Sequence, residues 1–234
     1  MKSDTEAESR KTEAESRKSA EAGSRESAAG SRLGELRRQA LKTLQDAEVL
    51  MRQGHFDYGN GFHGRVYLNP HQLFRYPSTI WRLAQDLLDV LPGELLERTE
   101  VVAGPATGGA LLAHTLAGLL DGRRALTHPP CSFAPFTMAD HRPVLKDFYS
   151  EQMRGRRVLL ADDVRNTGKT FEACAALVRE AGGTVLATVE ICDRMEAVID
   201  LGVPNYALVD YRAPENFPAA ECPMCQAGEP ITRF

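Results

Sequence analysis

Residues 158–170, VLLADDVRNTGKT, constrain the fold of this chain more than any other segment. Residues 158–161 are consecutively apolar, which is typical of a strand buried in a parallel sheet. Asp162 and Asp163 follow at the carboxyl end of that strand, and the polar residues 165–170 then lead into a helical pattern. A strand, a loop of backbone N–H groups and a helix N-terminus together bind anions, and carboxylates accept hydrogen bonds from adjacent sugar hydroxyls. The segment therefore predicts a site for phosphate and ribose.

The same order of elements occurs in ordinary strand–turn–helix units, and receiver-like α/β domains also carry acid pairs at strand ends. The hydroxyl-rich loop favours phosphate binding, as does Gly168, where the backbone can approach a ligand closely. The segment resembles the phosphoribosyl-pyrophosphate (PRPP) motif of type I phosphoribosyltransferases, although Asn166 replaces the usual Thr or Ser and Lys169 a frequent Gly. In that family the acid pair holds the ribose 2′- and 3′-hydroxyls and the loop wraps the 5′-phosphate. The resemblance implies PRPP binding by Asp162, Asp163, Arg165, Asn166, Thr167, Gly168, Lys169 and Thr170.

Length and composition limit the class of protein. A chain of 234 residues can form one sizeable α/β core with a small appendage. The formal net charge of -4 argues against nucleic-acid and anionic-membrane partners. Five scattered cysteines are typical of reduced intracellular thiols. No apolar run reaches the ~18 residues of a membrane span, and the N-terminus lacks the apolar core of a secretory signal. We expect a soluble cytoplasmic protein.

The first 32 residues differ from the rest of the chain. The heptapeptide TEAESRK occurs at residues 5–11 and again at 12–18, without the apolar positions of a coiled-coil seam. We therefore expect a low-complexity charged tail over 1–32, either disordered or transiently helical. The resemblance implies a phosphoribosyltransferase domain over 33–234. Within it we expect a small hood from about 33–75 plus the C-terminal tail, and a core over about 76–210.

Apolar periodicity predicts strands that alternate with helices. We expect a helix over 33–52 that Gly54 ends, short strands within 54–69, and a helix that Ser78 caps and Pro92 stops. Further along the chain, we expect strands over 99–103, 184–192 and 206–209, a buried helix over 110–120, and strand-like segments over 133–139 and 144–149. This alternation predicts an α/β fold with a doubly wound, mostly parallel sheet.

A second glycine-rich turn, residues 104–109, lies between a predicted strand and a predicted helix. It offers free N–H groups at a helix N-terminus, although such turns also exist only for close packing. In type I phosphoribosyltransferases a pyrophosphate loop occurs at this place in the chain. The resemblance therefore implies that Ala106, Thr107 and Gly108 bind pyrophosphate.

The basic segment 140–147 interrupts the sheet pattern. It resembles the flexible loop of the shorter-loop orotate phosphoribosyltransferases, which brings cations over the pyrophosphate, often from the neighbouring subunit. The resemblance implies catalytic roles for His141, Arg142 and Lys146 beside the acid pair, and a homodimer. A solvated, charged hairpin tip is the alternative.

Arg194 is the candidate for recognising the acceptor base. It follows a predicted strand at the sheet edge where α/β proteins bind ligands, and a guanidinium pairs with a carboxylate in two parallel hydrogen bonds. Orotate is the pyrimidine that carries a carboxylate, and the stretch from Asp193 resembles the DRxE motif of orotate phosphoribosyltransferases. Residues 54–67 resemble the hood of these enzymes, but Gly59 stands where some members have a Lys near the base.

Cys222 and Cys225 form a CxxC motif in the Pro-rich C-terminal region. A tetrahedral zinc site needs four ligands and no second CxxC exists, while a redox pair would need a thioredoxin-like context. Some orotate phosphoribosyltransferases end in a similar segment, which leaves its role open.

The resemblance implies transfer of the phosphoribosyl group from PRPP to orotate, giving orotidine 5′-monophosphate and pyrophosphate. It also implies Mg²⁺ as cofactor, held by Asp162 and Asp163 through water rather than by direct ligation. Three alternatives remain: a transferase for another base such as a purine, a non-catalytic PRPP-sensing regulator, and an interaction protein built on this fold through its N-terminal tail.

Overall fold

The computed structural model describes residues 30–58, 61–124, 129–140, 142–194, 199–212 and 215–232. The chain divides into two units, Met1–Gln39 and Ala40–Phe234. In the first unit the described residues, 30–39, are helical; the TEAESRK repeat lies outside the described part. All further elements belong to the second unit.

A six-stranded sheet forms the centre of the second unit, with the strand order β5-β4-β3-β6-β7-β8. The pairs β4–β3, β3–β6, β6–β7 and β7–β8 are parallel, and β5 pairs antiparallel with β4. The expected doubly wound, mostly parallel sheet is confirmed. Its strands are β3 (Val101–Pro105), β4 (Ser132–Ala139), β5 (Arg142–Val144), β6 (Arg157–Arg165), β7 (Thr184–Asp193) and β8 (Asn205–Asp210).

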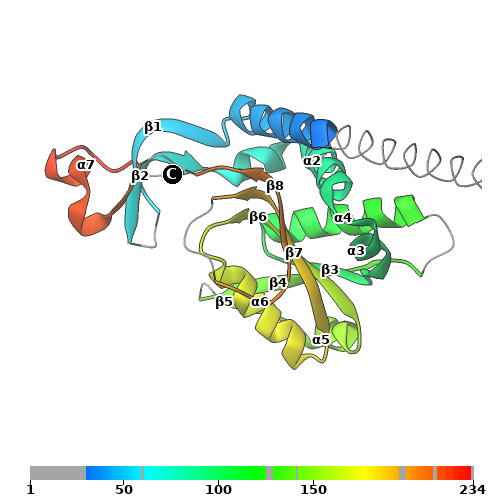
Figure 1. Cartoon of the computed structure of the whole chain (residues 1–234). Coiled ribbons are helices and arrows are strands. Elements are labelled where there is room, and N and C mark those ends of the chain that lie inside the picture. Colours follow the sequence, from blue (N-terminus) through cyan, green and yellow to red (C-terminus); the bar gives the residue numbers. More distant parts are fainter. Residues whose placement is uncertain are drawn as a thin grey trace, which may run out of the picture. The chain divides into compact units, whose positions relative to one another are not determined.

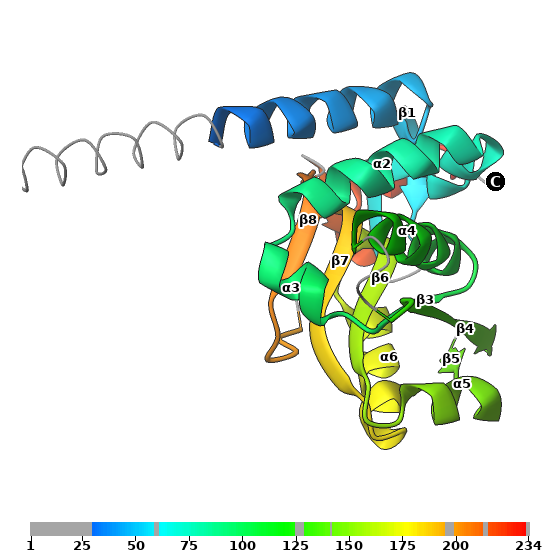
Figure 2. The same ribbon diagram turned by 90° about the vertical axis from the view of Figure 1, so that its right-hand side faces the viewer.

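Helices cover both faces of this sheet (Figure 2). On one face, α2 (Pro77–Val90) and α4 (Gly108–Arg124) share a hydrophobic core with β3, β6, β7 and β8, and the short α3 (Gly93–Arg98) packs against its edge. On the other face, α5 (Asp147–Met153) and α6 (Lys169–Glu180) enclose a second core. Burial on both faces explains why β3 has no exposed position along its length.

The connections reverse direction between β3 and β6. From β3 the chain passes through α4 to β4 on one side, whereas from β6 it passes through α6 to β7 on the other. Because β3 and β6 are hydrogen-bonded neighbours, α4 and α6 begin at adjacent strand ends. Ligands of open α/β sheets bind at such a switch point, outside the carboxyl ends of the strands.

A smaller antiparallel sheet, which we call the hood sheet, has the strand order β1-β2-β9 (Figure 1). Strands β1 (Leu50–Asp57) and β2 (Phe62–Leu68) are consecutive in the chain, whereas β9 (Asn216–Pro218) comes from its C-terminal part. Phe56 also bridges to Thr232. The short helices η3 (Ala219–Glu221) and α7 (Pro223–Gln226) lie between these contacts, and η1 (Pro70–Arg75) follows β2. The C-terminal segment is thus tied to strands more than 150 residues away.

The first predicted helix is shorter than the sequence indicated, because it ends at residue 46 rather than 52. Glu48 adopts a left-handed conformation, with φ of 56°, and Val49 N–H donates to Leu44 O at 2.9 Å. This Schellman-type end reverses the chain into β1. The residues that continued the helical spacing instead pair with β2, so Gly54 lies within a strand and ends no helix.

Two further element predictions were wrong. Ser78 caps no helix, because α2 begins one residue earlier at Pro77, whose fixed φ and missing N–H suit the first helical position. Residues 144–149 form no continuous strand: β5 ends at Val144 and α5 begins at Asp147, where an acidic side chain favours a helix N-terminus. Within the described part of the chain, no helix combines the length and apolarity needed to cross a membrane.

Candidate active site

Asp162 and Asp163 lie at the carboxyl end of β6, at the switch point. The strand continues to Arg165, so the acid pair is held by strand geometry and by short local bonds. Asp163 N–H donates to Asp162 Oδ1 at 2.9 Å, and Val164 N–H donates to Asp163 Oδ1 at 2.7 Å. Burial raises the pKa of both carboxyl groups, and the charge of Asp163 raises that of Asp162 further. A bound cation or hydroxyl donors would favour their ionised forms.

Next to this pair, β7 contributes two acids: Glu190, which sequence reasoning did not single out, and Asp193, the first residue of the DRxE stretch. Glu190 is opposite Asp162 in the β6–β7 register, and burial raises its pKa to about 8 although Asn205 Nδ2 donates to it at 2.7 Å. The Arg165 guanidinium pairs with Asp193, and its Nε lies 3.5 Å from Glu190 Oε1. The signal available for Glu190 was a lone carboxylate within an otherwise apolar stretch of β7, since Val189 and Ile191 flank it.

The loop between β6 and α6 closes around a cavity of about 140 Å³. Gly168, with φ of 82°, caps α6 and accepts a backbone bond from Glu172 N–H at 2.9 Å. The first-turn N–H groups of α6 have no partner inside the helix. Together with the helix dipole they make this end suitable for an anion. The cavity is lined by Tyr58, Asp162, Val164, Arg165, Asn166, Thr167, Gly168, Lys169, Thr170 and Phe171.

The glycine-rich turn after β3 lies directly against the acid pair. A β-carbon on Gly108 would be 1.8 Å from Asp163 Oδ2, and one on Gly109 would be 2.8 Å from Asp162 Oδ1. The turn is anchored by Ala106 N–H, which donates to Phe136 O at 2.8 Å, and its Ala106–Thr107 peptide bond is cis. Close packing also operates here, since a β-carbon on Gly104 would meet Gly109 O at 2.3 Å. The structure therefore brings together the two loops that the sequence predicted separately.

His71 in η1 is a neighbour of the acid pair that the sequence analysis missed. Burial raises the pKa of Asp163, and electrostatic attraction to the His71 side chain acts in the opposite, lowering direction. Phe74 from the same short helix packs beside Gly108. Nothing in the local sequence marks His71, because its proximity depends on how η1 lies against α4.

Arg194 is buried beside the loop between β6 and α6. Its Nη1 donates to Asn166 Oδ1 at 3.1 Å, and its Cζ lies 4.5 Å from the centre of the Tyr58 ring, a cation–π contact. Tyr58 follows directly after β1 of the hood sheet, and its hydroxyl donates to Val66 O at 2.6 Å. A β-carbon on Gly64 would lie 2.0 Å from that hydroxyl, so the glycine makes room for Tyr58.

The segment 140–147 forms a hairpin and a helix start. Ala139 pairs with Arg142, and Asp140 at the tip has φ of 48°. Arg142 and Lys146 are exposed, while His141 lies outside the described residues. Catalytic roles for these cations stay predictions, as does the alternative of a solvated hairpin tip. Glu196 of the DRxE stretch and Gly59 of the hood also lie outside the described part.

A family model described as phosphoribosyl transferase domain matches residues 80–202. The chain belongs to this family. The matched residues run from α2 past the end of β7 and include both loops of the site. This membership confirms the type I phosphoribosyltransferase fold that the motifs implied.

Curated relatives extend the similarity beyond the family model. The orotate phosphoribosyltransferase of Caldanaerobacter subterraneus is 32% identical over 197 residues, covering 84% of this chain and 96% of the relative. That of Erythrobacter litoralis is 33% identical, covering 83% and 95%. The crystal structure of orotate phosphoribosyltransferase from Aeropyrum pernix superposes with a TM-score of 0.56 at 25% identity, over 72% of this chain and 92% of that one. This phosphoribosyltransferase is therefore similar to the orotate enzymes over most of its length.

Proposed function

We propose that this phosphoribosyltransferase transfers the 5-phosphoribosyl group of PRPP to orotate, giving orotidine 5′-monophosphate and pyrophosphate. The observation that carries the choice of acceptor is the position of Arg194, which is buried between Asn166 of the phosphate loop and Tyr58 of the hood. A cation held there can pair with the orotate carboxylate in a bidentate arrangement. The names of the relatives at about a third identity support the same acceptor.

PRPP binding is assigned to the two adjacent loops. The N–H groups at the start of α6, with the hydroxyls of Thr167 and Thr170, bind the 5′-phosphate. The carboxylates of Asp162 and Asp163 accept hydrogen bonds from the ribose hydroxyls. The residues Ala106, Thr107 and Gly108 bind pyrophosphate at the start of α4.

Catalysis by this site rests on position and charge. The bond from C1′ of the ribose to pyrophosphate breaks as a ring nitrogen of the base approaches, so positive charge develops on the sugar and negative charge on the leaving group. The N-terminus of α4 stabilises the leaving group, while the Asp162 and Asp163 carboxylates orient the ribose. Arg142, Lys146 and His141 add positive charge and exclude water when the hairpin closes.

The acid pair fits a Mg²⁺ ion, because hard carboxylate oxygens are the ligands that this ion prefers and because burial without a cation disfavours two ionised carboxylates here. Asp162 and Asp163 would hold it, through water. When bound, it supplies charge neutralisation for the pyrophosphate oxygens.

The proposal includes a homodimer, in which the hairpin serves the partner's site, and a cytoplasmic location, which five free cysteines support.

A transferase for another base is the second candidate, because Gly59 stands where some orotate enzymes have a Lys. The two acceptors are distinguished by incubating the purified protein with PRPP and Mg²⁺, in parallel with orotate and with a purine base. We expect loss of the ultraviolet absorbance of orotate with an equal release of pyrophosphate. Pyrophosphate release with a purine and not with orotate would show that the acceptor is a purine base. PRPP binding without turnover on any base would make the protein a PRPP-sensing regulator.

A further inference from the structure

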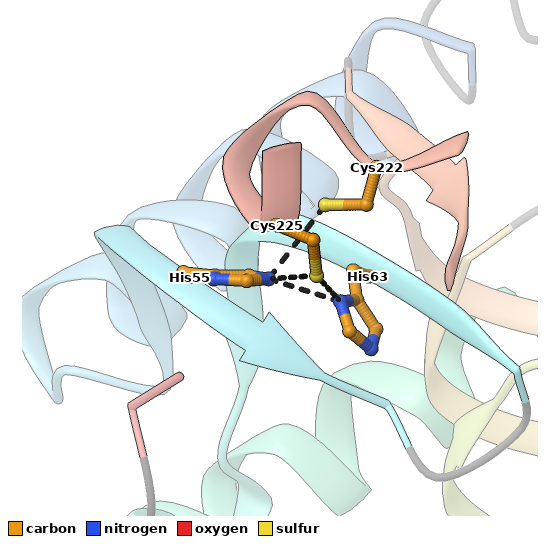
Figure 3. A group of neighbouring side chains, drawn as sticks. All are labelled: His55, His63, Cys222 and Cys225. Atoms are coloured by element: carbon orange, nitrogen blue, oxygen red, sulfur yellow. Dashed lines mark hydrogen bonds between the residues drawn. The ribbon is translucent and has the colours of Figure 1, made fainter. Parts of the chain in front are cut away.

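Two histidines of the hood sheet and the two cysteines of the CxxC motif converge on one point (Figure 3). His55 comes from β1, His63 from β2, and Cys222 and Cys225 from the turn that forms α7. One ligand atom from each residue lies within 4.8 Å of the other three. His55, His63 and Cys222 are buried, and Cys225 is exposed. The cluster lies outside the PRPP site and no step proposed above uses it.

The separations match those of a tetrahedral metal site. His55 Nε2 is 2.9 Å from His63 Nδ1, 3.6 Å from Cys222 Sγ and 3.5 Å from Cys225 Sγ, while Cys225 Sγ is 3.3 Å from His63 Nδ1. With Zn–N bonds of about 2.0 Å and Zn–S bonds of about 2.3 Å, tetrahedral angles place the two nitrogens about 3.4 Å apart and each nitrogen about 3.6 Å from each sulfur. The three N···S separations lie within about 0.3 Å of the tetrahedral value, and the N···N separation is shorter than it by about half an ångström.

The outer nitrogen of His55 is hydrogen-bonded in the way that metal-binding histidines require, and that of His63 faces a carboxylate. His55 Nδ1 lies 2.8 Å from the Glu229 carbonyl oxygen; because a carbonyl only accepts, Nδ1 carries the proton and Nε2 turns its lone pair inward. His63 Nε2 faces Asp57 Oδ1 at 3.8 Å, which favours the proton on Nε2 and a lone pair on Nδ1. The Glu229 side chain is in turn fixed by Arg65, with bonds of 3.0 and 2.9 Å.

We propose that His55, His63, Cys222 and Cys225 form a structural zinc site that ties the C-terminal segment to the hood sheet. Two thiolates and two neutral imidazoles balance the charge of Zn²⁺, and a tetrahedral S₂N₂ set is typical of this ion. One residue from each of β1 and β2 and two from a single CxxC turn complete the set of four. A closed set of four protein ligands leaves no position for substrate, so the role is structural rather than catalytic.

The site explains how a segment with little regular structure is held in place. The C-terminal residues 215–232 contain one three-residue strand, one three-residue 3-10 helix and one four-residue helix. Metal ligation would fix Cys222 and Cys225 against β1 and β2, the strands that lead to Tyr58. Metal binding in such small elements is coupled to their folding.

Metal analysis of the full-length protein, purified under reducing conditions without chelator, tests the proposal. We expect close to one zinc per chain by mass spectrometry. Replacement by Co²⁺ is expected to give the intense visible absorption of a tetrahedral ion and a thiolate-to-cobalt band in the near ultraviolet. Removal of the metal is expected to increase hydrogen exchange over residues 215–232 and to leave the central sheet protected.

Matched variants assign the ligands. Cys225→Ser and His63→Asn are expected to reduce bound zinc at least tenfold, whereas Cys131→Ser and His114→Gln, outside the cluster, retain it. Because Cys225 is exposed, its variant is the least disruptive to folding; Cys225→His, which keeps four ligands, is expected to bind Co²⁺ again with a changed spectrum. Zinc below a tenth of an equivalent in the wild type, zinc in both ligand variants equal to that of the wild type, or a Cys222–Cys225 disulfide in the reduced preparation would each overturn the proposal.

Discussion

Gly108 and Asp163 approach so closely that a single β-carbon on the glycine would lie 1.8 Å from Oδ2 of the carboxylate. Gly108 begins α4 and Asp163 lies near the end of β6, so this contact joins the predicted pyrophosphate loop to the predicted ribose-binding pair. The position of the acid pair thus depends on the absence of a side chain in another loop.

Gly108→Ala is expected to displace Asp163 and to lower kcat/KM by about 100-fold, since misplacement of a positioning group by about 1 Å costs that much. Gly122→Ala in the same helix is the control, because a β-carbon there meets nothing within 4 Å. Steady-state kinetics on both variants, with circular dichroism to check folding, measure the difference. Equal activity of the Gly108 and Gly122 variants would mean that the close approach of Gly108 to Asp163 is not needed for catalysis.

Asp163→Asn is expected to lower kcat/KM by roughly 10- to 100-fold, which corresponds to loss of one charged hydrogen bond. The fold should remain, because the amide is nearly the same size and the Val164 N–H bond can persist to its oxygen. Asp46→Asn, in an exposed pair with Lys42, is the control. Unchanged turnover in the Asp163 variant would remove this residue from the mechanism.

Arg194→Lys is expected to raise the KM for orotate roughly 10- to 100-fold while the affinity for PRPP changes little, since a lysine cannot form the bidentate pair. Separate titrations of the two substrates measure this. If the opposite pattern appears, with PRPP weakened and orotate unaffected, Arg194 acts on the loop through Asn166 and contacts no base.

The stability of the ligand-free protein is expected to fall as the pH rises. Burial raises the pKa of Glu190 from 4.5 to about 8, so the folded state binds this proton more strongly than the unfolded state does. The contribution of protonated Glu190 to the free energy of unfolding is fully present below about pH 4.5 and is lost as the pH rises to about 8. It amounts to a few kcal/mol, at about 1.4 kcal/mol per pKa unit.

Thermal or denaturant unfolding from pH 5 to pH 8 checks this expectation. Glu190→Gln keeps an oxygen that can accept from Asn205 and should lessen the slope, while the raised pKa values of Asp162 and Asp163 maintain a smaller slope of the same sign. Glu94→Gln, at an exposed position, should follow the wild type. A wild-type profile as flat as that of the Glu190 variant would contradict the raised pKa.

Local pattern was sufficient for the elements on which the proposed PRPP site is built. The buried run at 158–161 specified β6, because a strand buried on both faces needs consecutive apolar residues, and the polar loop after it leads into α6 as expected. The wrong end of the first helix has a cause outside its own residues. The helical spacing that reached residue 52 continued into β1, and pairing with β2 decided against the helix.

By itself, the sequence determined the doubly wound α/β class, the two strand-to-helix turns predicted to bind anions, and the acid pair, since each of these depends on residues adjacent in the chain. Only the tertiary structure decided which distant residues meet: Gly108 with Asp163, Tyr58 with Arg194, and His55 and His63 with Cys222 and Cys225. Such contacts depend on how loops and sheet edges pack after the chain has folded. No periodicity along the sequence encodes that packing, so a CxxC motif that lacked two ligands in the sequence has two histidines beside it in the fold.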